Sequence, residues 1–226
     1  MDSTSRLIVA LDLPDRKKIT SLAKELTGKV GMVKVGLEAF IAHGPDLVSE
    51  LKDMGHDVFL DLKVHDIPNT AASAAREADR LGASLLTVHG AGGAEMIKAA
   101  REAASDSLKI IAVTVLTSFD EPGFAEVGYR DDISASALTL AGVSRRAGAD
   151  GLVCSAFELE KLQEVGGLRV VPGVRPAGAA VGDQKRVVTP AEAVEKGATW
   201  IVVGRPIVKN ADPVAAAEQI VEQLSV

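Results

Sequence analysis

Three charged side chains lie within six residues of this chain, at Asp61, Lys63 and Asp66. They stand at the end of an apolar run, Asp57–Leu62, that is typical of a buried strand. Side chains two residues apart on a strand point to the same face, so Asp61 and Lys63 should lie side by side. Asp66 should follow in the turn that Pro68 helps to set. Buried charge is costly unless it is paired, and charge at a strand end indicates a functional site, with a structural ion pair as the alternative.

The same two aspartates could hold a magnesium ion, because carboxylate oxygens are the ligands that magnesium prefers. The lysine between them favours an internal ion-pair network instead. The sequence has no histidine and cysteine cluster with the spacing of a zinc site and no Gly-x-Ser-x-Gly nucleophile motif. We therefore expect no bound metal.

Short β-rich runs alternate with amphipathic segments along the whole chain. The predicted strands are Leu7–Leu11, Met32–Val35, Val58–Leu62, Leu85–Val88, Ile110–Val115, Gly151–Val153, Val170–Val171 and Trp200–Val203. The predicted helices are Arg16–Leu26, Pro45–Met54, Thr70–Leu81, Ala94–Ala104, Ile133–Ala147, Phe157–Val165, Pro190–Lys196 and Pro213–Leu224. This alternation implies parallel strands with right-handed crossovers.

Eight such repeats in 226 residues predict an α/β fold, a closed (β/α)8 TIM barrel, as a single domain over residues 1–226. An open doubly wound sheet is the alternative. That fold usually carries a glycine-rich phosphate turn after an early strand. Here the turn after the first predicted strand reads Asp12-Leu13-Pro14-Asp15, without glycine. The closed barrel is therefore favoured.

Functional groups of such barrels stand at the carboxyl ends of the strands. Polar residues follow seven of the eight predicted strands: Asp12, Lys34, Asp61 with Lys63, His89, Thr117 with Ser118, Arg175, and Gly204 with Arg205. Any one of them could be a solvated strand end. Their convergence on one rim predicts a site.

The loops after the last two strands indicate phosphate binding, which barrels often place there. Gly204 allows close approach of the backbone, and Arg205 offers a planar cation suited to phosphate oxygens. Arg175 opens a segment rich in glycine and alanine, Pro176–Arg186. That segment is either a plain surface loop or a lid that closes over a ligand, with Gln184 as a hydrogen-bonding tip.

Composition narrows the class of partner. The net charge is −6 and no basic run occurs, which argues against a general nucleic-acid surface but not against one phosphorylated small ligand. No apolar stretch is long enough to span a bilayer, and no signal-peptide pattern opens the chain. The one cysteine, Cys154, cannot form an intrachain disulfide. We expect a soluble cytoplasmic protein.

Taken together, these residues resemble the orotidine 5′-monophosphate decarboxylase family in its bacterial form, which catalyses the last step of de novo UMP synthesis. The resemblance covers nearly the whole chain, and its most specific part is the block Asp61–Thr70. The other segments that carry it are Leu11-Asp12, Lys34-Val35-Gly36, Thr114-Val115-Leu116-Thr117-Ser118, Val153-Cys154-Ser155, Pro172-Gly173-Val174-Arg175-Pro176, Gly182-Asp183-Gln184 and Val203-Gly204-Arg205-Pro206-Ile207.

The resemblance implies a cofactor-free enzyme that converts orotidine 5′-monophosphate into UMP and CO2 as a homodimer. Lys63 would protonate C6 of the pyrimidine, and Asp61 would lie beside the departing carboxylate. Lys34 and Asp66 would complete an alternating chain of charges, with Asp66 entering the site of the neighbouring subunit.

The implied substrate contacts fall into three groups. The ribose hydroxyls would meet Asp12, Lys34 and, from the neighbouring subunit, Thr70. The pyrimidine edge would meet Thr117. The phosphate would be held by Arg175, Gln184, Gly204 and Arg205.

Two other functions fit the same motif. One is a metal-dependent sugar-phosphate decarboxylase or aldolase on the same barrel, which shares the Asp-x-Lys-x-x-Asp core and should need magnesium. The other is a non-catalytic nucleotide-binding protein, against which the presence of Lys63 and both aspartates argues.

Overall fold

Eight parallel strands close into a barrel in the computed structural model, which describes residues 1–176 and 188–224. Each strand pairs with the next in the chain, and the first pairs with the last. The strands are β1 Leu7–Ala10, β2 Met32–Gly36, β3 Val58–Val64, β4 Leu85–His89, β5 Lys109–Val113, β6 Gly151–Val153, β7 Leu168–Pro172 and β8 Trp200–Val203. The predicted closed barrel is therefore confirmed, and the open doubly wound sheet is excluded.

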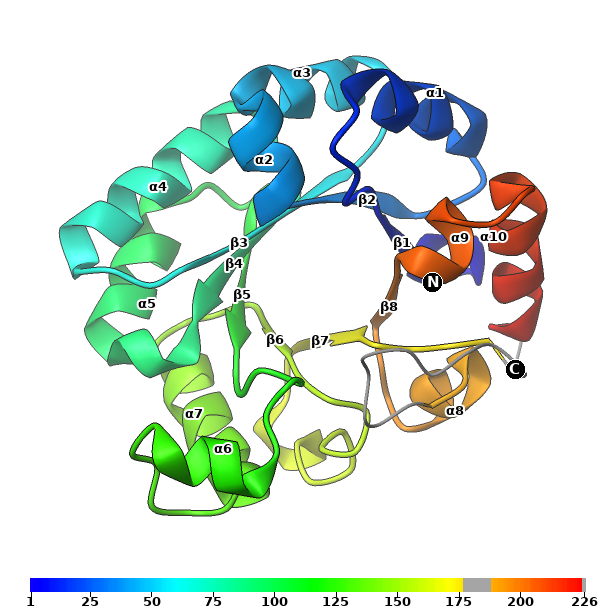
Figure 1. Ribbon diagram of the computed structural model, residues 1–226. Helices are drawn as coiled ribbons and strands as arrows, with labels where there is room; N and C mark the ends of the chain where they lie inside the picture. The colour runs from blue at the N-terminus through cyan, green and yellow to red at the C-terminus, as the bar shows by residue number, and fades with distance from the viewer. Residues whose placement is uncertain (177–187, 225–226) are drawn as a thin grey trace.

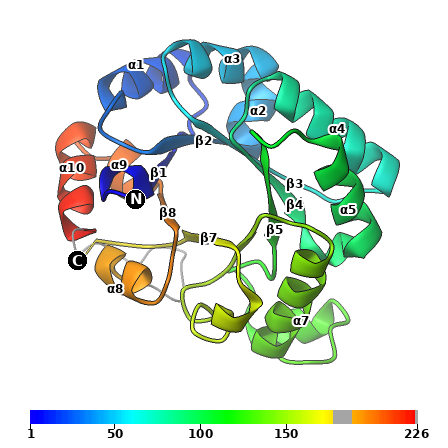
Figure 2. The same ribbon diagram turned by 180° about the vertical axis from the view of Figure 1, so that it is seen from behind.

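Helices surround the ring of strands, as Figure 1 shows along the barrel and Figure 2 shows from behind. They are α1 Arg16–Leu26, α2 Leu37–His43, α3 Pro45–Asp53, α4 Pro68–Arg80, α5 Gly93–Ala103, α6 Glu121–Glu126, α7 Ile133–Arg146, α8 Pro190–Glu195, α9 Arg205–Val208 and α10 Pro213–Gln223, with short 3-10 turns at Thr4–Arg6, Gly90–Gly92 and Gln163–Val165. None of the described helices is long and apolar enough to cross a membrane.

The predicted elements match this order with local differences. The helix predicted over Phe157–Val165 is wrong, because that segment forms turns that end in a single 3-10 turn. The short helices α2 and α6 were not predicted, since each has at most seven residues and too few turns to show a periodic apolar face. Strand β3 extends two residues further than predicted, to Val64, which brings Lys63 into the strand itself.

Two apolar layers hold the barrel together. One lies between strands and helices and contains the outward side chains of each strand, such as Leu7 and Val9 of β1. The other fills the inside of the ring with residues from alternate positions of seven strands: Ile8, Ala10, Met32, Phe59, Leu85, Ile111, Val170, Trp200 and Val202. Inward and outward side chains alternate because successive residues of a strand face opposite sides. The strand ends above the inner layer are thereby fixed in space.

Candidate active site

The candidate site is the next inward-facing layer above the apolar interior of the barrel. Two residues beyond Ala10, Met32, Phe59 and Leu85 stand, in the same order, Asp12, Lys34, Asp61 and Thr87. The inward face thus changes from apolar to polar at the carboxyl ends of the first four strands. Such a layer is where barrel enzymes place their chemistry.

Three of these side chains, together with Lys63, form an alternating series of charges, which we call the charged chain: Asp12, Lys34, Asp61 and Lys63. The ammonium of Lys34 lies 2.9 Å from Asp12 Oδ2 and 3.5 Å from Asp61 Oδ2. Lys63 Nζ donates to Asp61 Oδ1 at 2.9 Å. The predicted proximity of Asp61 and Lys63 is therefore confirmed, and the ion-pair network extends to Lys34 and Asp12.

The carboxylate of Asp61 is the centre of the charged chain, with a side chain only 14% exposed. Burial alone would raise its pKa. The nearby ammoniums of Lys34 and Lys63, together with hydrogen bonds from Lys63 and Thr87, outweigh burial and hold the pKa of Asp61 below its ordinary value. Asp61 is therefore ionised at neutral pH and fixes both cations.

Lys63 owes its position to a strained backbone rather than to simple strand alternation. Its φ is 50°, in the left-handed region, and no other described non-glycine residue has a positive φ. The pairing of β3 with β4 shifts register between Leu60 and Val64, so the strand bulges at this point. Strain of this kind is found mainly where function requires it.

The imidazoles of His65 and His89 lie stacked beside this bulge, with ring centroids 5.2 Å apart. Burial, and to a lesser degree the neighbouring His65 and Lys63, lower the pKa of His89. Its Nδ1 accepts a hydrogen bond from the N–H of Ala91. His89 therefore stays neutral near neutral pH and adds no positive charge beside Lys63.

Asp66 and Thr70 do not join the charged chain of their own protomer. Both are exposed, and Asp66 Oδ1 accepts the N–H of Ile67 at 2.7 Å. Among the described residues, Lys63 pairs with Asp61 and not with Asp66. An ion-pair network that contains Asp66 within one protomer is therefore a prediction that this structure contradicts, because the chain turns outward after Val64.

The predicted phosphate residues line one cavity next to the charged chain. It has a volume of about 450 Å³, and its lining contains Arg175, Gly204 and Arg205 together with Asp12 and Lys34. Arg175 is buried there although its guanidinium is charged. This cavity therefore brings together all the predicted phosphate residues but Gln184, which lies outside the described residues.

Thr117 lines a narrow pocket that adjoins this cavity, since Pro172 and Gly173 border both. The sequence thus located the residues of the rim. It missed Gly36, whose added Cβ would lie 2.4 Å from Asp12 Oδ1 and 2.8 Å from Lys34 Nζ. It also missed Thr87, which donates to Asp61 Oδ1 at 2.9 Å. The signal for Thr87 was its place two residues beyond the inward-facing Leu85.

A closed barrel with charged groups at the carboxyl ends of its strands defines a TIM-barrel enzyme. In the described part of the chain, no three His, Cys, Asp or Glu side chains converge as a metal site would require. Residues 5–220 match the model of the orotidine 5′-phosphate decarboxylase / HUMPS family. The chain belongs to this family.

Individual relatives give the same result. A protein named orotidine 5′-phosphate decarboxylase from Anaeromyxobacter sp. strain K is 50% identical over 223 residues, which cover 97% of this chain and 98% of that protein. The protein of that name from Alkalilimnicola ehrlichii is 48% identical over 99% of this chain and 97% of its own. The crystal structure of orotidine 5′-phosphate decarboxylase from Lactobacillus acidophilus superposes with a TM-score of 0.86 at 38% identity and covers 97% of this chain and 99% of its own.

Proposed function

We propose that this chain decarboxylates orotidine 5′-monophosphate to UMP and CO2 in pyrimidine biosynthesis, and that Lys63 supplies the proton to C6. Family membership and 50% identity to a named decarboxylase support the reaction. The single observation that carries the mechanism is the ammonium of Lys63, held 2.9 Å from the partly buried carboxylate of Asp61 at the barrel mouth.

The difficulty of this reaction is the charge left on carbon. When the bond between C6 and the carboxylate breaks, its electron pair stays on C6 in a vinyl-type orbital that the ring cannot delocalise well. The protein must then stabilise that charge with groups already in place. Two unit charges 4 Å apart interact by roughly 4 kcal/mol at an effective dielectric near 20.

A fixed ammonium therefore favours the localised carbanion over the dispersed charge of the ground state. Nζ of Lys63 then gives one proton to C6, which completes UMP, and the resulting amine takes a proton from solvent. Asp61, beside the departing carboxylate, keeps the ammonium aligned. This scheme uses neither a metal nor an organic cofactor.

Substrate binding fits the cavity described above. Arg175, Gly204 and Arg205 would hold the phosphate together with Gln184, which lies outside the described residues. Asp12 and Lys34 would meet the ribose hydroxyls, and Thr117 would meet the pyrimidine edge. Phosphate binding far from C6 can offset the cost of ordering the site and thereby contribute to turnover. Orotidine without phosphate should then lose turnover as well as affinity, and equal turnover at saturation would contradict this contribution.

We also propose that the enzyme is a cytoplasmic homodimer in which Asp66 and Thr70 complete the site of the partner. Both side chains are exposed, as groups that act in a neighbouring subunit would be in an isolated protomer. Leu37, Ile41 and Ile67 expose apolar surface on the segments that follow β2 and β3. Exposed apolar side chains of this size are typical of an interface. Mixing Lys63→Ala and Asp66→Ala protomers should restore activity, since such a heterodimer contains one intact site.

The decisive assay follows the ultraviolet absorbance of orotidine 5′-monophosphate in the presence of a strong chelator. Turnover under these conditions excludes the metal-dependent sugar-phosphate enzyme, and binding of UMP without turnover would favour the non-catalytic alternative. Lys63→Ala should lose decarboxylation almost completely while it still binds UMP. Substantial activity in that variant would remove Lys63 from its role.

Lys52→Ala is the matched control for Lys63→Ala. Lys52 also pairs with an aspartate, Asp57, and its side chain is 32% exposed against 35% for Lys63. Lys52 lies in α3, and its partner Asp57 directly precedes β3 at the end away from Lys63, so its loss should leave turnover unchanged. Equal losses in the two variants would point to a general effect of charge rather than to proton donation.

A further inference from the structure

We infer that Thr87 is a positioning residue for the decarboxylation, because its hydroxyl locks the backbone of Lys63 and the carboxylate of Asp61 into one hydrogen-bonded unit. This inference rests on the proposed role of Lys63. Thr87 itself is fully buried in β4 and acts through Lys63 and Asp61, the two residues that its hydroxyl contacts.

The hydroxyl of Thr87 both accepts and donates a hydrogen bond. It accepts the backbone N–H of Lys63 at 2.8 Å and donates to Asp61 Oδ1 at 2.9 Å. The same carboxylate oxygen accepts from Lys63 Nζ at 2.9 Å. The contacts form a closed ring, from the backbone of Lys63 through Thr87 and Asp61 to the ammonium of Lys63.

The register of the sheet explains why a side chain must do this. Leu60 pairs with Leu86 and Val64 pairs with Val88, so residues 61–63 of β3 face the single residue Thr87 of β4. The N–H of Lys63 is turned out of the regular ladder by its φ of 50°. An unpartnered N–H at this depth would be costly, and the hydroxyl of Thr87 takes the place of the missing carbonyl.

A left-handed residue without this support would relax toward ordinary backbone angles and carry its ammonium away from C6. Small displacements of a catalytic group reduce rate strongly, because the reacting atoms must approach in one geometry. Valine has nearly the shape of threonine but neither donates nor accepts a hydrogen bond. Thr87→Val therefore tests the hydroxyl with the least disturbance of packing.

The experiment compares Thr87→Val with Thr87→Ser, which keeps the hydroxyl, and with Thr114→Val. Thr114 is the matched control, since it is equally buried at the end of β5 and its hydroxyl donates to the backbone of Val153 rather than to a charged side chain. Each variant is measured for kcat, KM for orotidine 5′-monophosphate, Kd for UMP and thermal unfolding.

We expect Thr87→Val to lower kcat by about 10- to 100-fold, the range for losing hydrogen bonds to a charged group, while Kd for UMP changes by less than about threefold. Thr87→Ser should recover most of the wild-type kcat. Thr114→Val should keep the wild-type kcat even if its unfolding temperature falls as much as that of Thr87→Val. Exchange of the C6 proton of UMP with deuterium from solvent, the reverse of protonation, should slow in parallel with kcat.

Three results would overturn the inference: unchanged kcat in Thr87→Val, equal losses of kcat in Thr87→Val and Thr114→Val, or failure of Thr87→Ser to recover. Should Thr87→Val not fold, Thr87→Cys keeps a weak donor of similar size, and its kcat must then fall between those of wild type and Lys63→Ala. Lys63→Ala tests the proposed role of Lys63 separately from that of Thr87. If it is inactive while Thr87→Val is fully active, only the role of Thr87 fails.

Discussion

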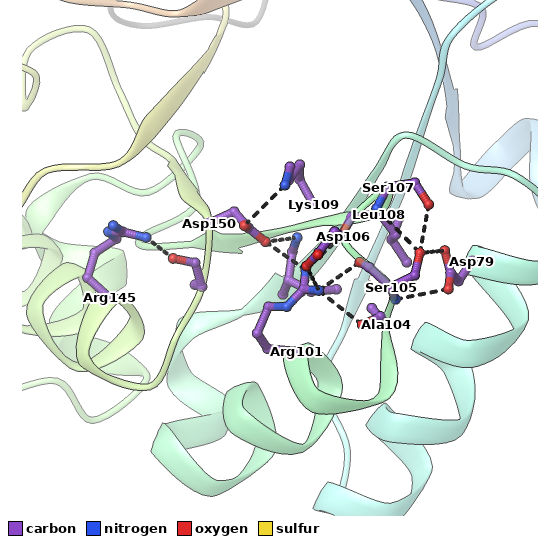
Figure 3. Close-up of polar contacts among 12 residues, drawn as sticks. Asp79, Arg101, Ala104, Ser105, Asp106, Ser107, Leu108, Lys109, Arg145 and Asp150 are labelled. Atoms are coloured by element: carbon purple, nitrogen blue, oxygen red, sulfur yellow. Dashed lines mark hydrogen bonds and ion pairs between the residues drawn. The ribbon is translucent and has the colours of Figure 1, made fainter.

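The two ends of the barrel each hold a charged cluster, and they are built in opposite ways. At the carboxyl ends of the strands, the ammonium of Lys63 has one carboxylate partner among the described residues and a strained backbone. At the opposite end, the guanidinium of Arg101 and the carboxylate of Asp150 form the centre of what we call the base network (Figure 3).

The base network uses nearly all of its hydrogen-bonding capacity on the protein itself. Arg101 donates to the carbonyl oxygens of Leu108, Ala104 and Ser105 at 2.7–3.0 Å, besides Asp150 Oδ2 at 3.0 Å. Asp150 Oδ2 also accepts the N–H of Ile110 at 2.8 Å. These contacts tie the loop before β5 to the start of β6, as Figure 3 shows.

The difference shows what each cluster is for. A guanidinium that is saturated by backbone carbonyls fixes a loop and has little left for a ligand. An ammonium with three N–H donors and one protein partner keeps donors for a substrate. The carboxyl ends of the strands thus hold the groups for chemistry, and the opposite end holds groups that stabilise the fold. The same division is general in TIM barrels.

Neutralising one carboxylate at each end of the barrel should separate the two roles most clearly. Asp61→Asn should lower kcat by at least about 100-fold, because it removes the charge that aligns Lys63, while Asp150→Asn should leave kcat within about twofold. Both variants should lose about 1–3 kcal/mol of stability, since each leaves partly buried cations with a weaker partner. Steady-state kinetics and urea unfolding measure the two quantities.

Asp150→Asn is the control for effects that follow from stability alone. A comparable drop of kcat in both variants would mean that the two ends are coupled and that the division between them is wrong. An unchanged kcat in Asp61→Asn would exclude Asp61 from the alignment of Lys63.

The next prediction concerns the packing of the charged chain. Gly36→Ala places a methyl group 2.4 Å from Asp12 Oδ1 and 2.8 Å from Lys34 Nζ, so both side chains must move. We expect a rise in KM and a fall in kcat/KM of about 10- to 100-fold, because the displaced groups are the proposed ribose contacts. Gly142→Ala in α7 is the control, since its methyl would meet only the flexible end of Arg146. Equal kinetics in the two variants would contradict the prediction.

The barrel architecture could be predicted from the sequence because the strand–helix pattern that indicates it is repeated eight times along the chain. Eight apolar runs at regular spacing define the strands whatever the details of any one of them. The exception is the segment Phe157–Val165, which has apolar residues at helical spacing but forms successive turns that end in the 3-10 turn Gln163–Val165.

Only part of the candidate site could be predicted from the sequence. Residue type and position at a strand end located Asp12, Lys34, Asp61 and Lys63 without any knowledge of the bulge. The bulge at Lys63 and the hydroxyl of Thr87 that supports it depend on the register between β3 and β4, which no local pattern in the sequence encodes. The proximity of Asp61 and Lys63 was thus predicted correctly, but from the alternation of a regular strand. In the structure a bulge, and not regular alternation, sets the position of Lys63.

A third prediction uses the pKa of Asp61, which is lower in the folded protein than its ordinary value of 3.8. Near that value the unfolded chain binds more protons at Asp61 than the folded one does, so stability falls as pH falls. This contribution is fully present well above pH 3.8 and is lost as pH drops through the lower folded-state pKa. Urea unfolding between about pH 6 and pH 3 should therefore show a steeper loss for wild type than for Asp61→Asn. Parallel curves would mean that Asp61 is not stabilised as an anion.

The smallest expected effect isolates the strain at Lys63 from its chemistry. At a φ of 50°, a side chain costs about 1–2 kcal/mol that glycine does not pay, partly offset by the greater freedom of glycine in the unfolded chain. Lys63→Gly should thus be more stable than Lys63→Ala by up to about 1 kcal/mol, although both lack the ammonium and both should be inactive.

Lys109 at the start of β5 provides the contrast at the other end of the barrel, since its φ is not positive. There glycine should be less stable than alanine by about 0.5–1 kcal/mol, as in an ordinary strand. The difference in unfolding free energy between the glycine and alanine variants should have opposite signs at Lys63 and Lys109. That result, measured by chemical unfolding, would show that backbone strain is confined to the end that performs the chemistry. The same sign at both would mean that the left-handed turn at Lys63 costs nothing, and Thr87 would then have no strained residue to hold.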